Sequence, residues 1–169
     1  MELLDLYNNR KELKNKTWIR DDVEPPLGEF KLAVHMWIIN KNNELLIQKR
    51  GSTKKTHPNK WAFTGGAVMA SETSYEGAVR EIKEELGIDV DDLDLLITFR
   101  REHDFVDVWV GKNNSKTENL VLSEREVSEV KWASLDEIEQ LIKDDCFVPA
   151  LNLYFDLFKK LLRKDYGFK

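Results

Sequence analysis

Three glutamates, Glu81, Glu84 and Glu85, stand at a spacing that places their carboxylates along one stripe of a helix. Carboxylates three and four residues apart repel one another on a helix, so a cation among them would stabilise the arrangement. Mg²⁺ prefers oxygen ligands and commonly binds through a few carboxylates together with the phosphates of a substrate. The spacing indicates a magnesium site, and a solvated acidic helix face is the alternative interpretation.

Residues 74–86 are expected to form the helix that carries these glutamates. Thr73 is a favourable N-cap with Glu76 three residues later, which is the capping-box arrangement, and Gly87 stands where a helix ends in the left-handed conformation. Four apolar residues share a face apart from the carboxylates: Tyr75, Val79, Ile82 and Leu86. We therefore expect that face in the core.

The glutamates belong to a longer pattern that occupies residues 66–88 without a gap, Gly-x5-Glu-x7-Arg-Glu-aliphatic-x-Glu-Glu-x-Gly-aliphatic. The residues that match it are Gly66, Glu72, Arg80, Glu81, Ile82, Glu84, Glu85, Gly87 and Ile88. With this pattern the chain resembles the Nudix hydrolase family of the MutT type. The resemblance extends to the expected strands on either side and covers roughly residues 28–145.

The resemblance implies a fold, a reaction and a metal. The implied fold class is α/β, a Nudix α/β/α sandwich with a mixed sheet in which the pattern forms a loop, a helix and a second loop. The implied reaction is hydrolysis of the phosphoanhydride bond of a nucleoside diphosphate, or of another diphosphate, linked to a further moiety. Mg²⁺, with Mn²⁺ as an alternative, would neutralise phosphate charge and lower the pKa of a bound water.

The resemblance also implies roles for individual residues. The implied metal ligands are the Gly66 carbonyl, Glu81, Glu84 and Glu85. Glu81 is in addition a candidate general base. Arg80 and Glu72 would pair to hold the loop against the helix, and they complete the set of candidate catalytic residues.

Two features leave details of this site open. Many relatives carry Glu-x-Gly before the glutamate at position 72, where this chain has Met69-Ala70-Ser71, so the number of metal ions is not determined. Family members also often use a carboxylate outside the pattern as a ligand or a base. The candidates are Glu124 and Glu126, followed by Glu102 and Glu118, and a solvated loop residue is the alternative interpretation of each.

Composition and charge exclude several other classes. The 169 residues are 41% hydrophobic and 34% charged, as in a globular protein, and a formal charge of -5 argues against a nucleic acid polymer as partner. The apolar runs are shorter than the ~20 residues that cross a bilayer, and the acidic start is unlike a signal peptide. We expect a cytoplasmic protein with no membrane partner and a buried or inert Cys146.

We expect a single domain over residues 1–169, because no linker or repeat interrupts the chain. Strands are expected at residues 2–7, 17–20, 30–39, 44–48, 61–63, 93–100, 105–110 and 127–132. For the N-terminal segment a helix that carries Leu3, Leu6 and Leu13 is the alternative. Ser134 and Glu137 form a second capping box, and Pro149 is expected to begin a C-terminal helix. Four apolar residues share a face of that helix: Leu151, Phe155, Phe158 and Leu162. This face would complete the core or form a homodimer interface.

Two alternative functions are considered. Residues 32–40, with Lys49-Arg50 and Lys54-Lys55 after them, are similar to the isopentenyl-diphosphate isomerase branch of the superfamily. However, Gly65 and Ala67 stand where that branch has its catalytic cysteine and a metal-binding histidine. The second alternative is a module of the same fold that senses nucleotides without cleaving them. Such modules typically lack signature carboxylates, and all of them are present here.

The substrate is a small-molecule diphosphate whose identity the sequence leaves open: a modified nucleoside triphosphate, ADP-ribose, a dinucleotide, a sugar nucleotide or an isoprenoid diphosphate. One basic group of residues could contact substrate phosphates or be solvated: Lys49, Arg50, Lys54, Lys55, His57 and Lys60. Trp37, Trp61 and Trp109 could stack on a base, with core packing as the alternative. His35 and His57 are interpreted as structural or surface residues.

Overall fold

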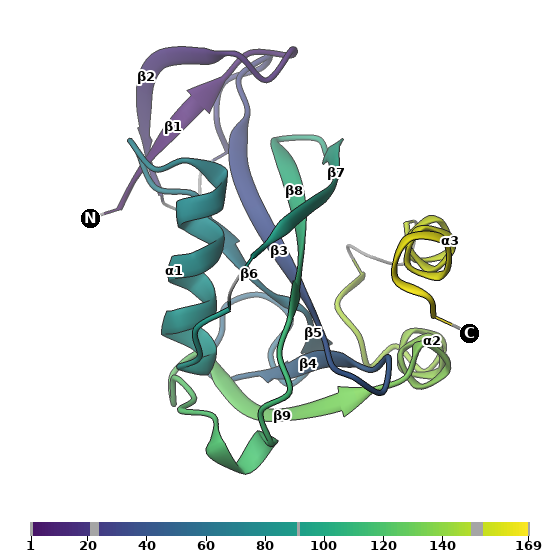
Figure 1. Ribbon diagram of the computed structural model, residues 1–169. Coiled ribbons are helices and arrows are strands. Elements are labelled where there is room, and N and C mark those ends of the chain that lie inside the picture. The colour runs from purple at the N-terminus through teal and green to yellow at the C-terminus, as the bar shows by residue number, and fades with distance from the viewer. Residues whose placement is uncertain (1, 21–23, 91, 150–153, 169) are drawn as a thin grey trace.

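The computed structural model describes residues 2–20, 24–90, 92–149 and 154–168. A sheet lies between helices on its two faces, with α1 (Ser74–Leu86) on one side and α2 (Leu135–Lys143) and α3 (Phe155–Tyr166) on the other (Figure 1). The expected α/β/α sandwich is therefore confirmed. No helix within these described ranges is long and apolar enough to cross a membrane.

The central sheet is mixed. Its strands are β3 (Lys31–Ile39), β4 (Leu45–Arg50), β5 (Trp61–Ala62), β6 (Thr64–Ala67), β7 (Asp94–Arg100), β8 (Asp104–Lys112) and β9 (Val127–Ala133). The order is β5-β4-β3-β8-β7, with β6 paired to β3 and β9 paired to β4. β3 and β8 run parallel, whereas the other named pairs are antiparallel. A short 3-10 helix (Thr117–Asn119) precedes β9.

β3 divides the core into two layers because successive side chains of a strand point to opposite faces. Leu32, Val34, Met36 and Ile38 pack in the cluster that includes Ile82 and Leu86 of α1. Trp37 and Ile39 pack in the other cluster, which includes residues of α2 and α3. The central strand thereby holds the helices on both faces in place.

Two features of the sheet go beyond the expected strands. β3 and β4 are antiparallel neighbours joined by a turn at residues 40–43, and their pairing is limited to Ile39 and Leu45. The strand expected at residues 61–63 is followed by β6, which continues through Gly65 and Gly66 and pairs with β3. This pairing matters because it places the glycines beside α1.

The N-terminal strands form a separate two-stranded sheet, β1 (Leu3–Tyr7) and β2 (Leu13–Ile19). The expected first strand is confirmed, and the second begins earlier than residue 17. This hairpin docks on the loop that precedes α1. The Ala70 amide donates to the Leu3 carbonyl at 2.7 Å, and the Ser71 amide donates to the Asp5 carboxylate at 2.8 Å. The hairpin therefore supports the loop from outside.

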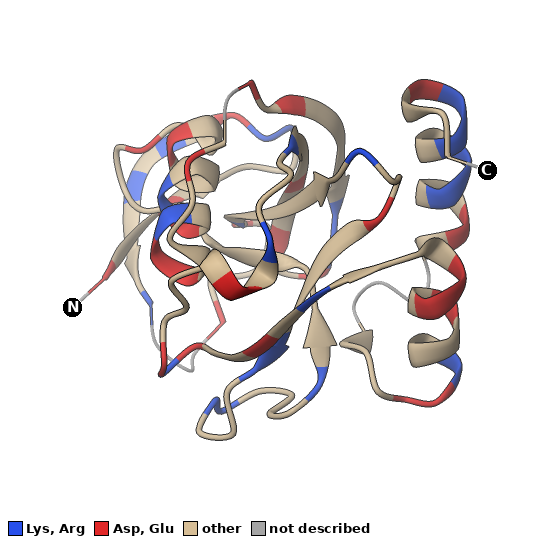
Figure 2. Ribbon diagram, turned by 60° about the horizontal axis from the view of Figure 1, so that its bottom comes forward, with Lys and Arg blue, Asp and Glu red and all other residues tan. Residues whose placement is uncertain are grey.

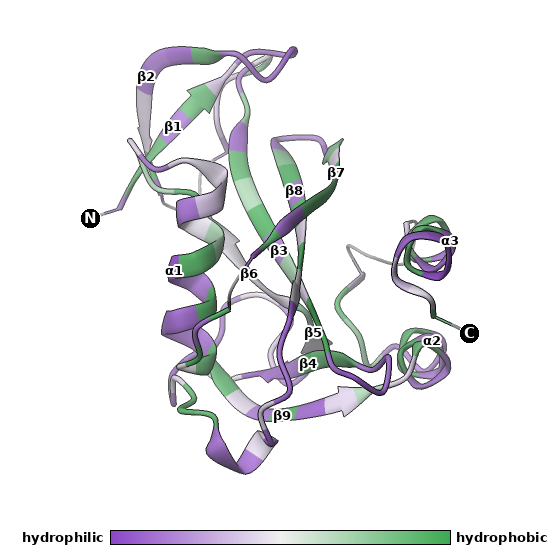
Figure 3. Cartoon of the chain, viewed as in Figure 1, coloured by the Kyte–Doolittle hydropathy of each residue, from purple (hydrophilic) through white to green (hydrophobic). Residues whose placement is uncertain are grey.

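α3 completes the core with its apolar face. Phe155, Phe158 and Leu162 are buried, and the Phe158 ring meets the Trp37 ring edge-on with centroids 4.9 Å apart. Figure 3 shows hydrophobic and hydrophilic residues side by side along this helix. The helix begins at Phe155 with Tyr154 as its N-cap, so Pro149 does not begin it, and Leu151 lies outside the described residues.

Cys146 was expected to be buried or inert, and the first of these is wrong because this cysteine is exposed. It follows α2 in a tight connection, where its amide donates to the Leu141 carbonyl at 2.8 Å. Its carbonyl accepts from the Trp61 amide at 2.8 Å, so the backbone is held at the sheet while the thiol faces outward.

The packing of α3 yields a stability prediction from two neighbouring residues. Phe158→Ala should lower the free energy of unfolding by about 3–5 kcal/mol, because it leaves a cavity where a fully buried ring contacts Trp37. Leu157→Ala is the matched control, since that side chain is 47% exposed, and it should cost less than about 1 kcal/mol. Urea unfolding measures both. Equal losses would contradict the docking of α3 on the core.

Candidate active site

α1 begins and ends as its residue types dictate. The Thr73 hydroxyl accepts from the Glu76 amide at 3.2 Å, and the Glu76 carboxylate accepts from the Thr73 amide at 2.7 Å. Gly87 ends the helix with φ 68°, and a Cβ there would lie 2.7 Å from the Val121 Cβ. The predicted helix and both of its caps are confirmed.

The apolar face of α1 differs from the expected one. Ile82 and Leu86 are buried, together with Ala78, but Tyr75 and Val79 are exposed. The helix has turned so that two of the three glutamates approach the sheet. Glu81 is 8% exposed and Glu85 is 4% exposed, whereas the Glu84 side chain is 60% exposed. The acidic stripe therefore straddles the boundary between core and solvent.

Glycines in β6 allow this close approach of helix and strand. A Cβ at Gly66 would lie 2.1 Å from the Glu81 Oε1 atom, which no real side chain tolerates. A Cβ at Gly65 would lie 2.5 Å from the Val34 carbonyl oxygen. Glycine at position 66 of the pattern therefore has a steric explanation, because a side chain there would occupy the space of the Glu81 carboxylate.

Glu85 is held in a fixed position. Its Oε2 atom accepts from the Gln48 side-chain amide at 2.8 Å and from the Gly65 backbone amide at 3.2 Å. Burial, followed by the nearby charge of Glu81, raises the pKa of Glu85 to about 7. Burial also raises the pKa of Glu81. Gln48 was not singled out in the sequence, although a polar residue after the apolar run 45–47 was a signal.

Arg80 ties the loop before α1 to the helix. Its Nε donates to Glu72 Oε1 at 2.7 Å, and its Nη2 donates to the Ala67 carbonyl at 2.9 Å and to Glu72 Oε2 at 3.1 Å. Glu72 also accepts from the Met69 amide at 2.9 Å, and its hydrogen bond with Arg80 lowers its pKa. The two residues thus form a bidentate pair inside the loop.

The remaining nitrogen of Arg80 faces the other glutamates. Nη1 donates to Glu81 at 2.9 Å and to Glu84 at 3.1 Å. Among the described residues, no three His, Cys, Asp or Glu side chains are grouped ready to hold a metal ion. The donor set still suits Mg²⁺, because Glu81, Glu84 and Glu85 offer hard carboxylate oxygens beside the Gly66 backbone.

These residues line a cavity of about 430 Å³. Acidic and basic side chains both reach it, and Figure 2 shows the two signs interleaved along α1. Its lining residues include Arg20, Arg50, Lys54, Arg80, Glu81, Glu84, Glu85 and Glu126. Arg50 and Lys54 come from the basic group noted in the sequence. Arg20 and its ion-pair partner Glu2 come from the N-terminal hairpin, which no sequence pattern connected to this site.

The four candidate carboxylates outside the pattern lie in different places. Glu126 lines the cavity, forms an ion pair with Lys54 and adds to the field that raises the pKa of Glu85. Glu124 is exposed and is not part of the lining. Glu102 and Glu118 are also exposed outside it, and they lie 3.6 Å from a nitrogen of His103 and of Lys116, respectively. Of these four carboxylates, Glu126 is therefore the one that lines the cavity.

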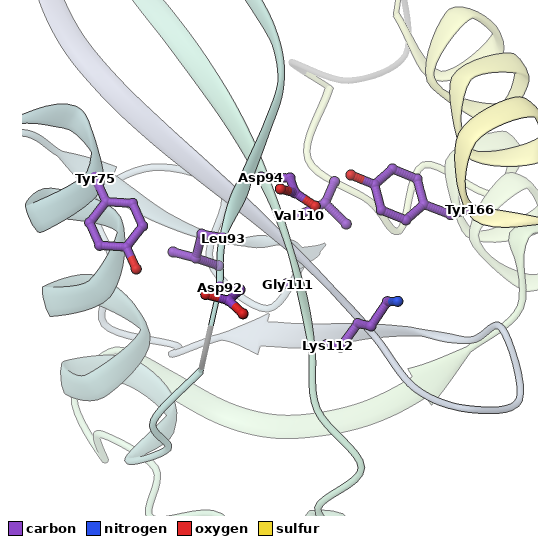
Figure 4. Close-up of a pocket in the computed structure, with 8 residues that line it drawn as sticks. All are labelled: Tyr75, Asp92, Leu93, Asp94, Val110, Gly111, Lys112 and Tyr166. Carbon is purple, nitrogen blue, oxygen red and sulfur yellow. The ribbon is translucent and has the colours of Figure 1, made fainter.

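A further cavity of about 680 Å³ lies away from these glutamates. Figure 4 shows Tyr75 of α1 on one side and Tyr166 of α3 on the other, with residues of β7 and β8 between them. None of the residues that match the pattern lines it. Of the three Trp residues, Trp37 and Trp61 are buried in the core, whereas Trp109 is half-buried and donates to Ser74 at 3.0 Å.

Comparison with known proteins decides the family. The family model for the NUDIX domain matches residues 29–151. The chain belongs to the Nudix family. It is a Nudix hydrolase, an enzyme that acts on diphosphate bonds.

The similarity to relatives extends over nearly the whole chain. An uncharacterised Nudix hydrolase of Listeria innocua is 37% identical over 162 residues, covering 93% of this chain and 95% of the relative. A prenyl-diphosphate phosphatase of Methanosarcina mazei is 28% identical, covering 71% and 74%. Among solved structures, DR0079 of Deinococcus radiodurans has a TM-score of 0.73 at 25% identity, covering 85% and 90%.

The pKa of Glu85 predicts how stability depends on pH in the presence of a chelator. The folded state holds this proton more tightly than the unfolded chain, whose carboxyl has a pKa near 4.5. The stabilisation is therefore complete below pH 4.5 and is lost as the pH rises to about 7, a loss of up to about 3 kcal/mol. Glu85→Gln should reduce this slope to the part that Glu81, whose pKa is also raised, contributes, as measured by denaturant unfolding across that range.

The exposed Glu118→Gln is the control and should keep the wild-type slope. Identical slopes for wild type and Glu85→Gln would show that Glu85 does not titrate in this range.

Proposed function

We propose that this Nudix enzyme is a metal-dependent hydrolase that cleaves the phosphoanhydride bond of a diphosphate linked to another moiety, with the reaction in the 430 Å³ cavity. One observation carries the proposal: buried glutamates of α1 and cationic side chains from other elements face the same cavity. A diphosphate needs both, since cations bind its oxygens and carboxylates hold a metal.

The cations would bind the substrate. Arg20, Arg50 and Lys54 reach the cavity from the N-terminal hairpin, from β4 and from the loop after it. They can contact phosphate oxygens with charge-assisted hydrogen bonds, which are stronger than neutral ones. The pair of Lys54 with Glu126 keeps one of them at the cavity in the absence of substrate.

The proposed metal ligands are Glu81, Glu84, Glu85 and the Gly66 carbonyl. Mg²⁺, or Mn²⁺ in its place, would supply charge neutralisation of the phosphates and a bound water of lowered pKa. Other residues of the chain would hold these ligands in position. Gln48 and the Gly65 amide orient Glu85, and the Arg80–Glu72 pair holds the loop that carries Gly66. Glu81, beside Arg80, is the proposed general base that takes the proton of the attacking water.

The isomerase alternative is disfavoured by the environment of residue 65. A side chain there would meet the Val34 carbonyl oxygen at 2.5 Å, so a catalytic cysteine cannot be accommodated without a backbone shift. A non-catalytic sensor remains the second candidate. It is disfavoured because every carboxylate of the pattern is present and two of them are kept buried despite the cost of desolvation.

The substrate is a small-molecule diphosphate in this proposal, and neither a nucleic acid polymer nor a membrane takes part. We place the enzyme in the cytoplasm. The prenyl-diphosphate phosphatase among its relatives makes isoprenoid diphosphates one class to assay beside nucleotides. A homodimer is compatible with these roles.

The activity test is a substrate panel with Mg²⁺ or with a chelator: nucleoside triphosphates, ADP-ribose, dinucleotides, sugar nucleotides and isoprenoid diphosphates. Mass spectrometry identifies the products. Cleavage should require the metal, and Glu85→Gln and Glu84→Gln should each lower kcat by orders of magnitude while circular dichroism stays unchanged. Tight binding without turnover in the wild type would favour the sensor, and unchanged turnover in both variants would refute the ligand assignment.

Glu126 and Glu124 provide a matched pair for the contribution of the loop before β9. Glu126→Gln should lower kcat/KM by about tenfold or more, because it removes a charge that faces Glu85 and Lys54 in the cavity. Glu124→Gln changes the same charge two residues away on the exposed surface, and kcat/KM should change less than about twofold. Equal effects of the two substitutions would contradict the selection of Glu126.

A further inference from the structure

A cavity different from the 680 Å³ one adjoins the catalytic cavity at Gly65 and Arg50, which line both. Its volume is about 330 Å³. The other lining residues, which together with these two define what we call the basic cavity, are His35, Thr56, His57, Ala62, Phe63, Arg101 and Val148. The two cavities are therefore neighbours that share part of their walls.

The lining of the basic cavity includes two arginines and no carboxylate. Arg50 donates to the Thr56 carbonyl at 3.0 Å and to the Thr56 hydroxyl at 3.2 Å, and it has no ion pair among the described residues. Arg101 is held by Asp104, with N–O distances of 2.6 and 2.5 Å, but Asp104 is not part of the lining. The catalytic cavity is rich in glutamates, so the two cavities differ in charge.

His35 lies among apolar residues on the face of the sheet that α2 and α3 cover. His35 lies on β3 between Ala33 and Trp37, which pack in the core on that side. Its Nδ1 atom is buried, and within the described structure no hydrogen-bond partner reaches it. Gly65 leaves room for the ring, since a Cβ there would lie 2.8 Å from the His35 Cδ2. A buried nitrogen without a partner is rare and is typical of a site that a ligand or a water completes.

We propose that the basic cavity is an anion-binding subsite, which receives a further phosphate or carboxylate that the substrate carries beyond the diphosphate. The proposal rests on the proposed function of the catalytic cavity. Arg50 lines both cavities and contacts the substrate where its phosphates pass from the catalytic cavity to the basic cavity. Arg101 contributes charge at the subsite, and His35 contributes a hydrogen bond. Guanidinium groups suit both anions because their planar donors match the oxygens.

An apolar chain fits the basic cavity less well. It would remove water from the guanidinium and imidazole groups without replacing their hydrogen bonds, which is unfavourable. The apolar part of the wall is committed to the core: the Phe63 ring stacks on Trp37 with centroids 4.4 Å apart and meets Phe147 at 5.5 Å. The subsite therefore favours substrates with an additional anionic group over isoprenoid diphosphates.

The test compares inorganic diphosphate with inorganic triphosphate, which adds one phosphate and nothing else. Calorimetry at one Mg²⁺ concentration, with Glu85→Gln present in every sample to prevent turnover, gives both affinities. Triphosphate should bind about tenfold more tightly than diphosphate. Adding Arg101→Gln should remove most of this difference and change the diphosphate affinity less than about twofold. Arg101→Lys, which keeps the charge, should retain most of it.

Two further variants separate a local effect from a general one. Arg163→Gln removes the same charge from the exposed side of α3 and should change neither affinity. His35→Phe keeps a ring but removes its nitrogens, and it should weaken triphosphate alone. Thermal unfolding of each variant verifies that it is folded.

Equal affinities for the two anions would overturn the subsite, as would Arg101→Gln and His35→Phe variants that both bind triphosphate normally. Failure of the proposed function looks different, because the wild type would then cleave no diphosphate in the substrate panel. The binding comparison does not depend on turnover, so it decides the subsite in either case.

Discussion

The close approach of α1 to β6 is the constraint on which the rest of this structure depends. It removes Glu81 and Glu85 from water, which is costly for carboxylates unless hydrogen bonds or charges compensate. Gln48, the Gly65 amide and Arg80 provide that compensation in the described structure. The pKa of both carboxyls stays above the ordinary value, so the compensation is partial.

The other elements can be understood from this approach. β6 contains two glycines because a side chain at either position would collide with a carboxylate or with the backbone of β3. The loop between β6 and α1 is held on the inside by the Arg80–Glu72 pair and on the outside by the N-terminal hairpin. β3 carries apolar side chains on both faces, so it fixes the helices of both layers relative to β6. The position of the candidate active site thus depends on the packing of the core.

Much of the fold could be predicted because its signals are local. The bounds of α1 follow from Thr73, Glu76 and Gly87, whose side chains or conformations act on adjacent backbone groups. Strand positions followed from alternation of apolar and polar residues, and the second capping box located α2. The errors arose where contacts distant in sequence decide burial: Tyr75 and Val79 were expected in the core and are exposed.

The family, the helix with its caps and the set of acidic residues in the pattern follow from the amino-acid sequence alone. Tertiary structure decided which of them are buried, and that Glu126, rather than Glu124, faces the cavity. It also brought Arg20 and Gln48 to residues more than thirty positions away. The physical reason is that spacing along a helix specifies angles about its axis, whereas burial and charge depend on neighbours that the sheet and the hairpin supply.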